Sequence, residues 1–299
     1  MFRNHHQLYQ FGTQKQAQLH SSTVVILGCG GLGCIVAMHL ASSGVGHLVL
    51  VDYDKVEESN LHRQLSYVKQ DIGSYKANVL KEWCIQHQPG ITITTVVEAC
   101  SDTNIHTIIH QGDKPVHAVV DCMDSARTKV MVNLYCKRLG IPYIFGSAVA
   151  WDGQVCTMMP HHPCLNCIFP SYEVGSDSCE LRGVLGPIPC VIGSLQAVEC
   201  IKVLTKLHPD IQNQHTTLVN YSGWDNTFEH MECTTCDSCS YCYPNNRVEN
   251  KVTSTFEQEY PIEISYAEYL VQKQTKDVTL LLDIRLQPTE EQQLIQTKR

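Results

Sequence analysis

The sequence of 299 residues has no run of basic side chains, and its 30 acidic residues outnumber its 22 basic ones. A protein that binds the phosphate backbone of nucleic acid needs clustered lysine and arginine, so a formal net charge of -8 argues against that partner. We find no apolar stretch that approaches the roughly 18 residues of a membrane span. The polar start MFRNHHQ is unlike a signal peptide. We therefore expect a cytoplasmic protein whose partners include no nucleic acid and no membrane.

Sixteen cysteines are present instead, and some of them stand in pairs. In a reducing compartment, CxxC pairs bind metal or carry out redox chemistry more often than they form disulfides. Cys164 and Cys167 form one such pair. Cysteines outside a motif are expected to be small buried apolar residues. A second pair would complete a tetrahedral metal site, and two candidates exist: Cys233 with Cys236, or Cys239 with Cys242.

Short apolar runs rich in β-branched residues alternate with helical patterns in the first half of the chain. A helical pattern over residues 74–88 has Ser74 as its predicted N-cap. The alternation predicts an α/β fold with a doubly wound, Rossmann-like and mostly parallel sheet, whose ligands lie at the carboxyl ends of the strands. The predicted strands are residues 23–28, 47–52, 91–97, 116–122 and 142–148.

The pattern changes after residue 150. Residues 152–160 predict an antiparallel strand, 192–207 a long amphipathic helix and 216–223 one more strand. A polar linker is predicted over 245–260, and the last residues, 261–299, begin with a helix and a strand of something new. We therefore divide the chain into a main domain over 1–244, the linker, and a partial C-terminal segment.

A glycine motif of the form GxGxxG lies between the first predicted strand and its helix. Its members are Gly28, Gly30 and Gly33. Glycines at this spacing allow a tight turn and let a nucleotide approach the backbone closely. Asp52, at the end of the second strand, fits a ribose. These features alone are also compatible with a nicotinamide dinucleotide.

Two cations make a triphosphate the better ligand. Arg63 and Lys76 add positive charge beside the same crevice, and Lys76 lies near a helix N-terminus that also favours anions. A dinucleotide site would leave both without a role. Asp124, just past the fourth strand, is placed to hold Mg2+ against the phosphates. The pattern indicates ATP.

Five stretches carry a family resemblance: ILGCGGLGC, VDYDKVEESNLHRQ, IGSYK, DCMD and IGSLQAVE. Together they resemble the MoeB/ThiF branch of the E1-like activating enzymes, and within it the eukaryotic members that join an adenylyltransferase to a sulfurtransferase. The resemblance runs from about Phe11 to Tyr243. It implies a ThiF-type E1 fold, a homodimer, and adenylation with ATP and Mg2+ of a ubiquitin-like sulfur carrier that ends in Gly-Gly. Such carriers serve molybdenum cofactor synthesis and tRNA thiolation.

The resemblance also implies roles for single residues. Catalytic roles fall on Arg63, Lys76, Asp124 and Cys179. Fixed cations suit the reaction, because a carboxylate attacks the α-phosphate and both groups are negative. No general base is needed, since the carrier's carboxylate is already ionised. The residues expected to contact the nucleotide or its Mg2+ are Gly31, Asp52, Ser59, Asn60, Leu61, His62, Arg63, Lys76, Asp124 and Ser125.

In the family the second cysteine pair follows a strand, an aromatic residue and about ten further residues. Phe228 as that aromatic selects Cys239 and Cys242, which with Cys164 and Cys167 would bind Zn2+. Four thiolates leave no open position for a substrate, so the metal would be structural. Cys233 and Cys236 are then spare thiols or an alternative pair.

The remaining cysteine with an implied role is Cys179, in the loop GSDSCELRGVLG. The resemblance gives it a thioester or persulfide link to the carrier, which suits a thiolate because it attacks an activated acyl group and leaves again. The other interpretation is an ordinary loop cysteine.

Three departures from the family pattern leave a second hypothesis open. Asn4 stands where the family has an arginine, with Arg3 beside it, and Ser125 stands where an asparagine is common. The tail, with Asp283 and Arg285, resembles only the opening of a rhodanese-like domain. We expect an active adenylyltransferase that needs a separate sulfurtransferase or cysteine desulfurase. The alternative is a catalytically impaired E1-like scaffold that binds a ubiquitin-like protein.

Overall fold

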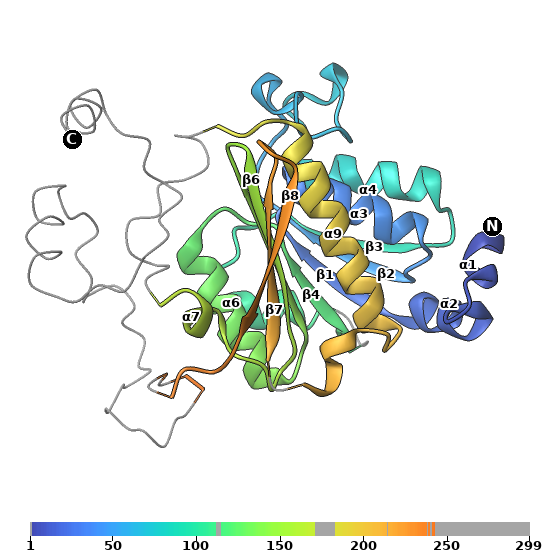
Figure 1. Ribbon diagram of the computed structural model, residues 1–299. Coiled ribbons are helices and arrows are strands. Elements are labelled where there is room, and N and C mark those ends of the chain that lie inside the picture. Colours follow the sequence, from blue (N-terminus) through green and yellow to red (C-terminus); the bar gives the residue numbers. More distant parts are fainter. Residues whose placement is uncertain are drawn as a thin grey trace, which may run out of the picture. The chain divides into compact units, whose positions relative to one another are not determined.

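The computed structural model describes residues 2–111, 115–170, 183–213, 215–237, 239 and 241–242. Within them, eight strands form one sheet in the order β3-β2-β1-β4-β5-β6-β7-β8 (Figure 1). The first five in this order run parallel, and β6, β7 and β8 extend the sheet as antiparallel neighbours. The strands are β1 (Thr23–Leu27), β2 (His47–Val51), β3 (Thr92–Val96), β4 (Ala118–Asp121), β5 (Tyr143–Val149), β6 (Asp152–Met158), β7 (Thr216–Ser222) and β8 (Thr227–Cys233).

Helices cover both faces of this sheet (Figure 1). They are α1 (Arg3–Gln7), α2 (Gly12–Ser21), α3 (Gly31–Ser42), α4 (Lys76–His87), α5 (Ile105–Ile109), α6 (Ala126–Leu139), α7 (Leu165–Ile168) and α9 (Pro187–Leu204). Short 3-10 helices are η1 (Glu58–Asn60), η2 (Lys69–Asp71) and η3 (Pro209–Gln212). The predicted α/β fold with a mostly parallel, Rossmann-like sheet is confirmed.

Two apolar clusters form the core, one on each face of the sheet. In β1, Val24 and Ile26 belong to the cluster beneath α3, α4 and α9, whereas Val25 and Leu27 belong to the cluster beneath α5 and α6. Alternate side chains of a strand point to opposite faces, so a strand covered on both sides is apolar throughout. This is why the central strands were predictable as continuous apolar runs.

Strand β8 was not predicted. Its residues are almost all exposed, because it is the edge strand of the described sheet and pairs only with β7 there. Glu229 and Glu232 interrupt its apolar pattern, and no buried face imposes an alternation. The predicted linker and the partial C-terminal segment over residues 245–299 lie outside the described residues.

The predicted N-cap of α4 is wrong by one residue. Tyr75, not Ser74, occupies that position, and its side chain makes no capping hydrogen bond. Tyr75 pairs with Lys55 in an isolated antiparallel bridge, so the backbone is still extended where the serine was expected to start the helix. The Ser74 carbonyl instead accepts a hydrogen bond from Val56 N.

The expectation that no apolar stretch is long enough to cross a membrane is also wrong. By length and composition α9 qualifies, with 18 residues of mean hydropathy 1.4. Half of this helix is buried in the fold, where it packs against α3 and the sheet. It begins at Pro187, earlier than predicted, because proline is well tolerated in the first turn of a helix.

Glu199 near the end of α9 gives the fold a testable dependence on pH. Burial alone would raise the pKa of this carboxyl, but hydrogen bonds from His208 and Lys202 outweigh burial and hold its pKa at about 2, below the ordinary 4.5. The His208 Nε2 to Glu199 Oε2 distance is 2.8 Å. Because the folded state favours the ionised form, the stabilisation is complete above about pH 4.5 and is lost as the pH falls towards 2.

Glu199→Gln is therefore expected to lower the free energy of unfolding by about 2 kcal/mol at neutral pH. Urea denaturation of both proteins at about pH 7 and about pH 3 measures this, with the difference shrinking at the lower pH. A difference that stays constant between these conditions would contradict the assignment.

Candidate functional site

The glycine loop between β1 and α3 forms the floor of the candidate site. Gly28 has φ +88°, and a Cβ there would lie 2.8 Å from the carbonyl oxygen of Cys122. A Cβ on Gly33 would lie 1.8 Å from the Gly28 carbonyl oxygen, so any side chain at that position would clash. At Gly30 the nearest described atom is 3.7 Å from the missing Cβ, on Gln64. Gly28 and Gly33 close the turn, whereas a Cβ on Gly30 would only come into ordinary van der Waals contact with Gln64.

Asp52 follows β2 and is buried beside this loop. Its Oδ2 accepts from Cys29 N at 2.6 Å, and its Oδ1 accepts from Asp54 N at 2.7 Å. Burial raises the pKa of the Asp52 carboxyl, although both backbone donors and Lys76 act in the opposite direction. Each carboxylate oxygen can accept a second hydrogen bond, so the residue can still receive ribose hydroxyls.

Lys76, the first residue of α4, is held in an ion pair that the sequence did not indicate. Its ammonium lies 2.8 Å from Asp54 Oδ2, and only 7% of the lysine side chain is exposed. Its backbone N–H also donates to the Asp54 carbonyl at 3.0 Å. Asp52, Asp54 and Lys76 therefore form one connected chain of contacts that starts at the glycine loop.

The segment after β2 contains the other predicted contacts. Asn60 is buried at the end of η1, where its Oδ1 accepts from Glu57 N at 3.1 Å and its Nδ2 donates to Ser59 Oγ at 3.3 Å. Arg63 is partly exposed, and its Nη1 donates to the Ser59 carbonyl at 3.0 Å. The amide of Asn60 thus builds the turn that carries Arg63.

Helix α9 begins against this same segment. A Cβ on Gly186 would lie 2.6 Å from the His62 carbonyl oxygen, and one on Gly31 would lie 3.0 Å from Pro189 Cβ. Leu61 packs against the core beneath. Figure 1 shows the light-blue segment between β2 and α4 at the same end of the sheet as the start of α9.

Asp124 and Ser125 connect β4 to α6 and are both exposed. Ser125 is the N-cap of α6, since its Oγ accepts from Thr128 N at 3.3 Å. Asp54 raises the pKa of the Tyr53 hydroxyl most, and desolvation, Asp124 and Asp52 add to that effect. Asp124 therefore lies close enough to the acids that follow β2 to act on the same hydroxyl, at the carboxyl end of the parallel strands.

A second centre lies on the other side of the sheet, where four cysteines come together. The ligand atoms of Cys164, Cys167, Cys239 and Cys242 all lie within 4.8 Å of one another. Three of the sulfur–sulfur distances are 3.8, 3.6 and 3.5 Å. A tetrahedral site with bonds of about 2.3 Å would place its sulfurs about 3.8 Å apart, so the cluster can hold a metal ion.

Cys233 and Cys236 are not part of that cluster. Cys233 ends β8, where its Sγ donates to the Met231 carbonyl at 3.6 Å. Cys236 is exposed, and its backbone N–H donates to Cys167 Sγ at 3.4 Å. Cys236 thus supports a cluster sulfur through its backbone.

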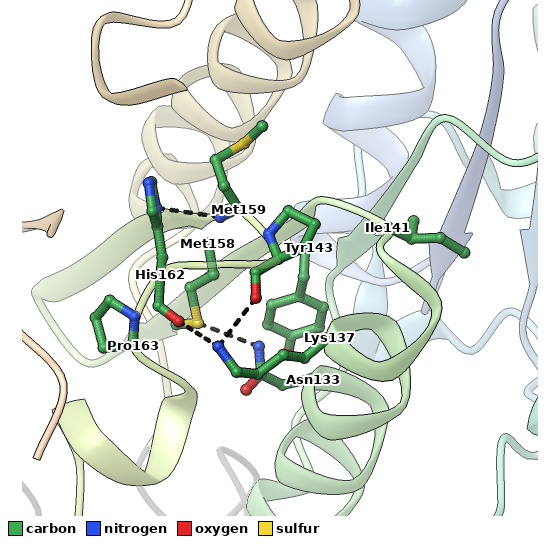
Figure 2. A pocket seen from close by; sticks show the side chains of 9 residues that line it. Asn133, Lys137, Ile141, Tyr143, Met158, Met159, His162 and Pro163 are labelled. Carbon is green, nitrogen blue, oxygen red and sulfur yellow. Dashed lines mark hydrogen bonds between the residues drawn. The ribbon is translucent and has the colours of Figure 1, made fainter. Parts of the chain in front are cut away.

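Helix α6 holds the segment that leads to the first cysteine pair. Lys137 Nζ donates to the Pro160 carbonyl at 3.0 Å and to the His162 carbonyl at 2.5 Å. Asn133 Oδ1 accepts from Leu165 N at 2.8 Å. Figure 2 shows the Lys137 ammonium pointing towards these carbonyls within a small pocket. Lys137 lines this pocket and fixes the backbone of residues 160 and 162 through these two hydrogen bonds.

Residues 2–241 match the model of the ThiF family. The chain belongs to the ThiF family.

Curated relatives agree with this assignment. The chain is 39% identical over 201 residues to adenylyltransferase and sulfurtransferase MOCS3 of Caenorhabditis briggsae, covering 66% of this chain and 49% of the relative. It is 34% identical to the SAMP-activating enzyme E1 of Haloferax volcanii, and the match covers 78% of this chain and 84% of that enzyme. It is 32% identical to the sulfur carrier protein ThiS adenylyltransferase of Escherichia coli, and the match covers 77% of this chain and 90% of that enzyme. The chain spans about half the length of the first of these relatives.

Solved structures show the same fold. Escherichia coli MccB with MccA-N7isoASN aligns with a TM-score of 0.66 at 26% identity, covering 76% of this chain and 68% of MccB. The structure of MccB with ATP aligns with a TM-score of 0.63, also at 26% identity and with the same coverage. Both likenesses support the ThiF assignment.

Three residues that the sequence singled out in this ThiF family member are not part of the site described above. Cys179 lies outside the described residues, so its role stays a prediction. Arg3 and Asn4 are both exposed on α1, which His5 ties to α2 through a 2.9 Å hydrogen bond between its Nδ1 and Gln16 Oε1. Sequence reasoning missed Asp54, although the doubled acid in VDYD was a signal for it.

Proposed function

We propose that this chain uses ATP to adenylate the C-terminal glycine of a ubiquitin-like sulfur carrier, with release of pyrophosphate. The observation that carries the proposal is the contact chain from the glycine loop through Asp52 and Asp54 to Lys76. It holds a buried cation next to the glycine loop of a ThiF-family chain, which supports a nucleotide site there. The printed names of its relatives, which include a ThiS adenylyltransferase, support the reaction class.

The chemistry follows from the charges. The carrier's carboxylate and the α-phosphate repel each other, and Lys76 and Arg63 offset that repulsion as negative charge moves onto the leaving pyrophosphate. Asp52 would bind the ribose hydroxyls, and Asn60 would keep the turn that carries Arg63. The absence of a side chain at Gly30 would let the phosphates approach the backbone closely.

Two metal ions complete the proposal. Asp124 fits Mg2+, because it is an exposed carboxylate close to the other acids of the crevice and can share the ion with ATP phosphates. The ion would supply charge neutralisation at the pyrophosphate. The four clustered cysteines fit a structural Zn2+, since their sulfur spacing matches a closed tetrahedral site.

The chain would act as a homodimer in the cytoplasm, where it would receive a carrier ending in Gly-Gly for molybdenum cofactor synthesis or tRNA thiolation. Sulfur would come from a separate sulfurtransferase or a cysteine desulfurase, and Cys179 would link covalently to the carrier. These parts of the proposal rest on the family resemblance.

Carrier-dependent exchange of labelled pyrophosphate into ATP tests the reaction. We expect exchange only when Mg2+ and a carrier ending in a free Gly-Gly carboxylate are both present. The matched control is the same carrier with its terminal carboxylate amidated, which cannot attack the α-phosphate. Carrier binding without any exchange would favour the impaired scaffold instead. NAD binding tighter than ATP binding would overturn the nucleotide assignment.

A further inference from the structure

A fully buried ion pair lies beneath the loop that carries Asp124, and the proposed chemistry does not use it. Asp121 ends β4 and Lys129 lies in the second turn of α6. The lysine Nζ is 3.1 Å from Asp121 Oδ1, and the two side chains are 2% and 0% exposed. Burying two charges is costly, and such a pair is seldom a source of net stability. The groups that this ion pair holds in place therefore indicate its role.

The same carboxylate gathers hydrogen bonds from several elements. Asp121 Oδ1 also accepts from Met123 N at 2.9 Å, and Oδ2 accepts from the Tyr143 hydroxyl of β5. Lys129 Nζ donates to the Gly146 carbonyl of β5 at 2.8 Å. The ion pair therefore ties the β4–α6 loop and the start of α6 to the neighbouring strand.

These contacts bracket Asp124 on both sides. Met123, just before it, is held to Asp121 through its backbone N–H. Lys129, one turn after the Ser125 N-cap, is held to the same carboxylate. The exposed Asp124 thus projects from a short segment whose two ends are fixed to one buried group.

We propose that Asp121 and Lys129 are positioning residues that fix the Asp124 carboxylate at the mouth of the nucleotide site. This inference rests on the proposed function, because it assigns Asp124 to the divalent metal of bound ATP. An ionised Asp121 can accept from Met123 N, Lys129 and Tyr143 together. Removing the cation leaves this carboxylate buried without its charge partner, so the loop must rearrange to solvate it.

The test is the Lys129→Met variant, which keeps most of the volume and loses the charge. Mn2+ has the same preference for oxygen ligands as Mg2+, and its binding can be followed by electron paramagnetic resonance in the presence of a non-hydrolysable ATP analogue. We expect Mn2+ affinity to fall about 10-fold to 100-fold, as for loss of groups that orient a metal ligand. Binding of the analogue without metal should change little.

Glu199→Gln is the matched control, because it breaks another carboxylate contact, partly buried and near the C-terminal end of α9. It should leave Mn2+ affinity unchanged. Equal Mn2+ affinity in the wild type and a folded Lys129→Met protein would overturn the inference. So would an equal loss of metal-dependent and metal-free analogue binding in a folded Lys129→Met protein, because the ion pair would then support nucleotide binding in general and not the metal ligand.

Tyr143→Phe keeps the inference testable if Lys129→Met fails to fold. It removes only the hydroxyl that donates to Asp121 and to the Lys129 carbonyl. A several-fold loss of Mn2+ affinity is then expected, and no loss would contradict the inference. The proposed function and the positioning role are tested separately. Absence of exchange by the wild type refutes the proposed function, whereas Mn2+ binding reports on the loop that carries Asp124.

Discussion

Lys76→Met is expected to lower the rate of carrier-dependent ATP–pyrophosphate exchange by about 10²–10³, the loss typical of one preorganised electrostatic contact. The ammonium is almost fully buried and lies 2.8 Å from Asp54 Oδ2, so its position is fixed before the nucleotide arrives. Methionine keeps the volume and removes the charge. The effect should fall on the rate at saturating ATP, because the charge is needed most as pyrophosphate leaves.

Lys69→Met is the control for this prediction. Lys69 lies in η2, between β2 and α4, and its side chain is 77% exposed. Its Nζ lies 3.8 Å from Glu58 Oε1, so the ion pair is long and exposed to solvent. Its loss should leave exchange within about twofold of the wild type, because an exposed pair of this kind contributes little. Full exchange activity in Lys76→Met would show that the cation is a structural partner of Asp54 and no more.

Serine at any of the four clustered cysteines is expected to release a bound zinc ion. Elemental analysis of the purified protein should find about one zinc per chain, and Cys239→Ser should lose most of it. Structural zinc in small domains binds with about 10–16 kcal/mol at neutral pH, so the segment after β8 depends heavily on the metal. Thermal denaturation should show a marked fall in Tm for the same variant.

The spare cysteines provide the comparison. Cys233→Ser and Cys236→Ser should keep the zinc, because neither sulfur belongs to the cluster. The Cys236 contact to Cys167 is made by its backbone N–H, which serine retains. Zinc loss in these two variants, with retention in Cys239→Ser, would mean that the other pair binds the metal.

The parallel part of the fold could be predicted because strands that are buried on both faces are continuous apolar runs in the sequence. Runs such as Val24 to Leu27 have no polar residue at all. The strand β8 has no such run, since its side chains face solvent. The first two helices also escaped prediction: α2 buries only Gln16 and Leu19, and α1 has no buried residue.

The candidate site was predictable for residues whose type is set by local chemistry. The glycines obey steric limits within one turn, and Asp52 follows directly after a strand. Pairings across space were not predictable, because Lys76 meets Asp54 over 22 positions and Tyr143 meets Asp121 over 22 as well. Such contacts depend on which helices and strands become neighbours in the fold, and short sequence motifs do not indicate this.

Helix α6 presents Lys129, Asn133 and Lys137 at intervals of four residues, so the three lie along one face. The first holds Asp121 at the end of β4, and the last holds the carbonyls before the first cysteine pair. At 1.5 Å per residue, about 12 Å of helix separates them. If α6 opens as one unit, the proposed metal site at Asp124 and the cysteine cluster would lose their support together.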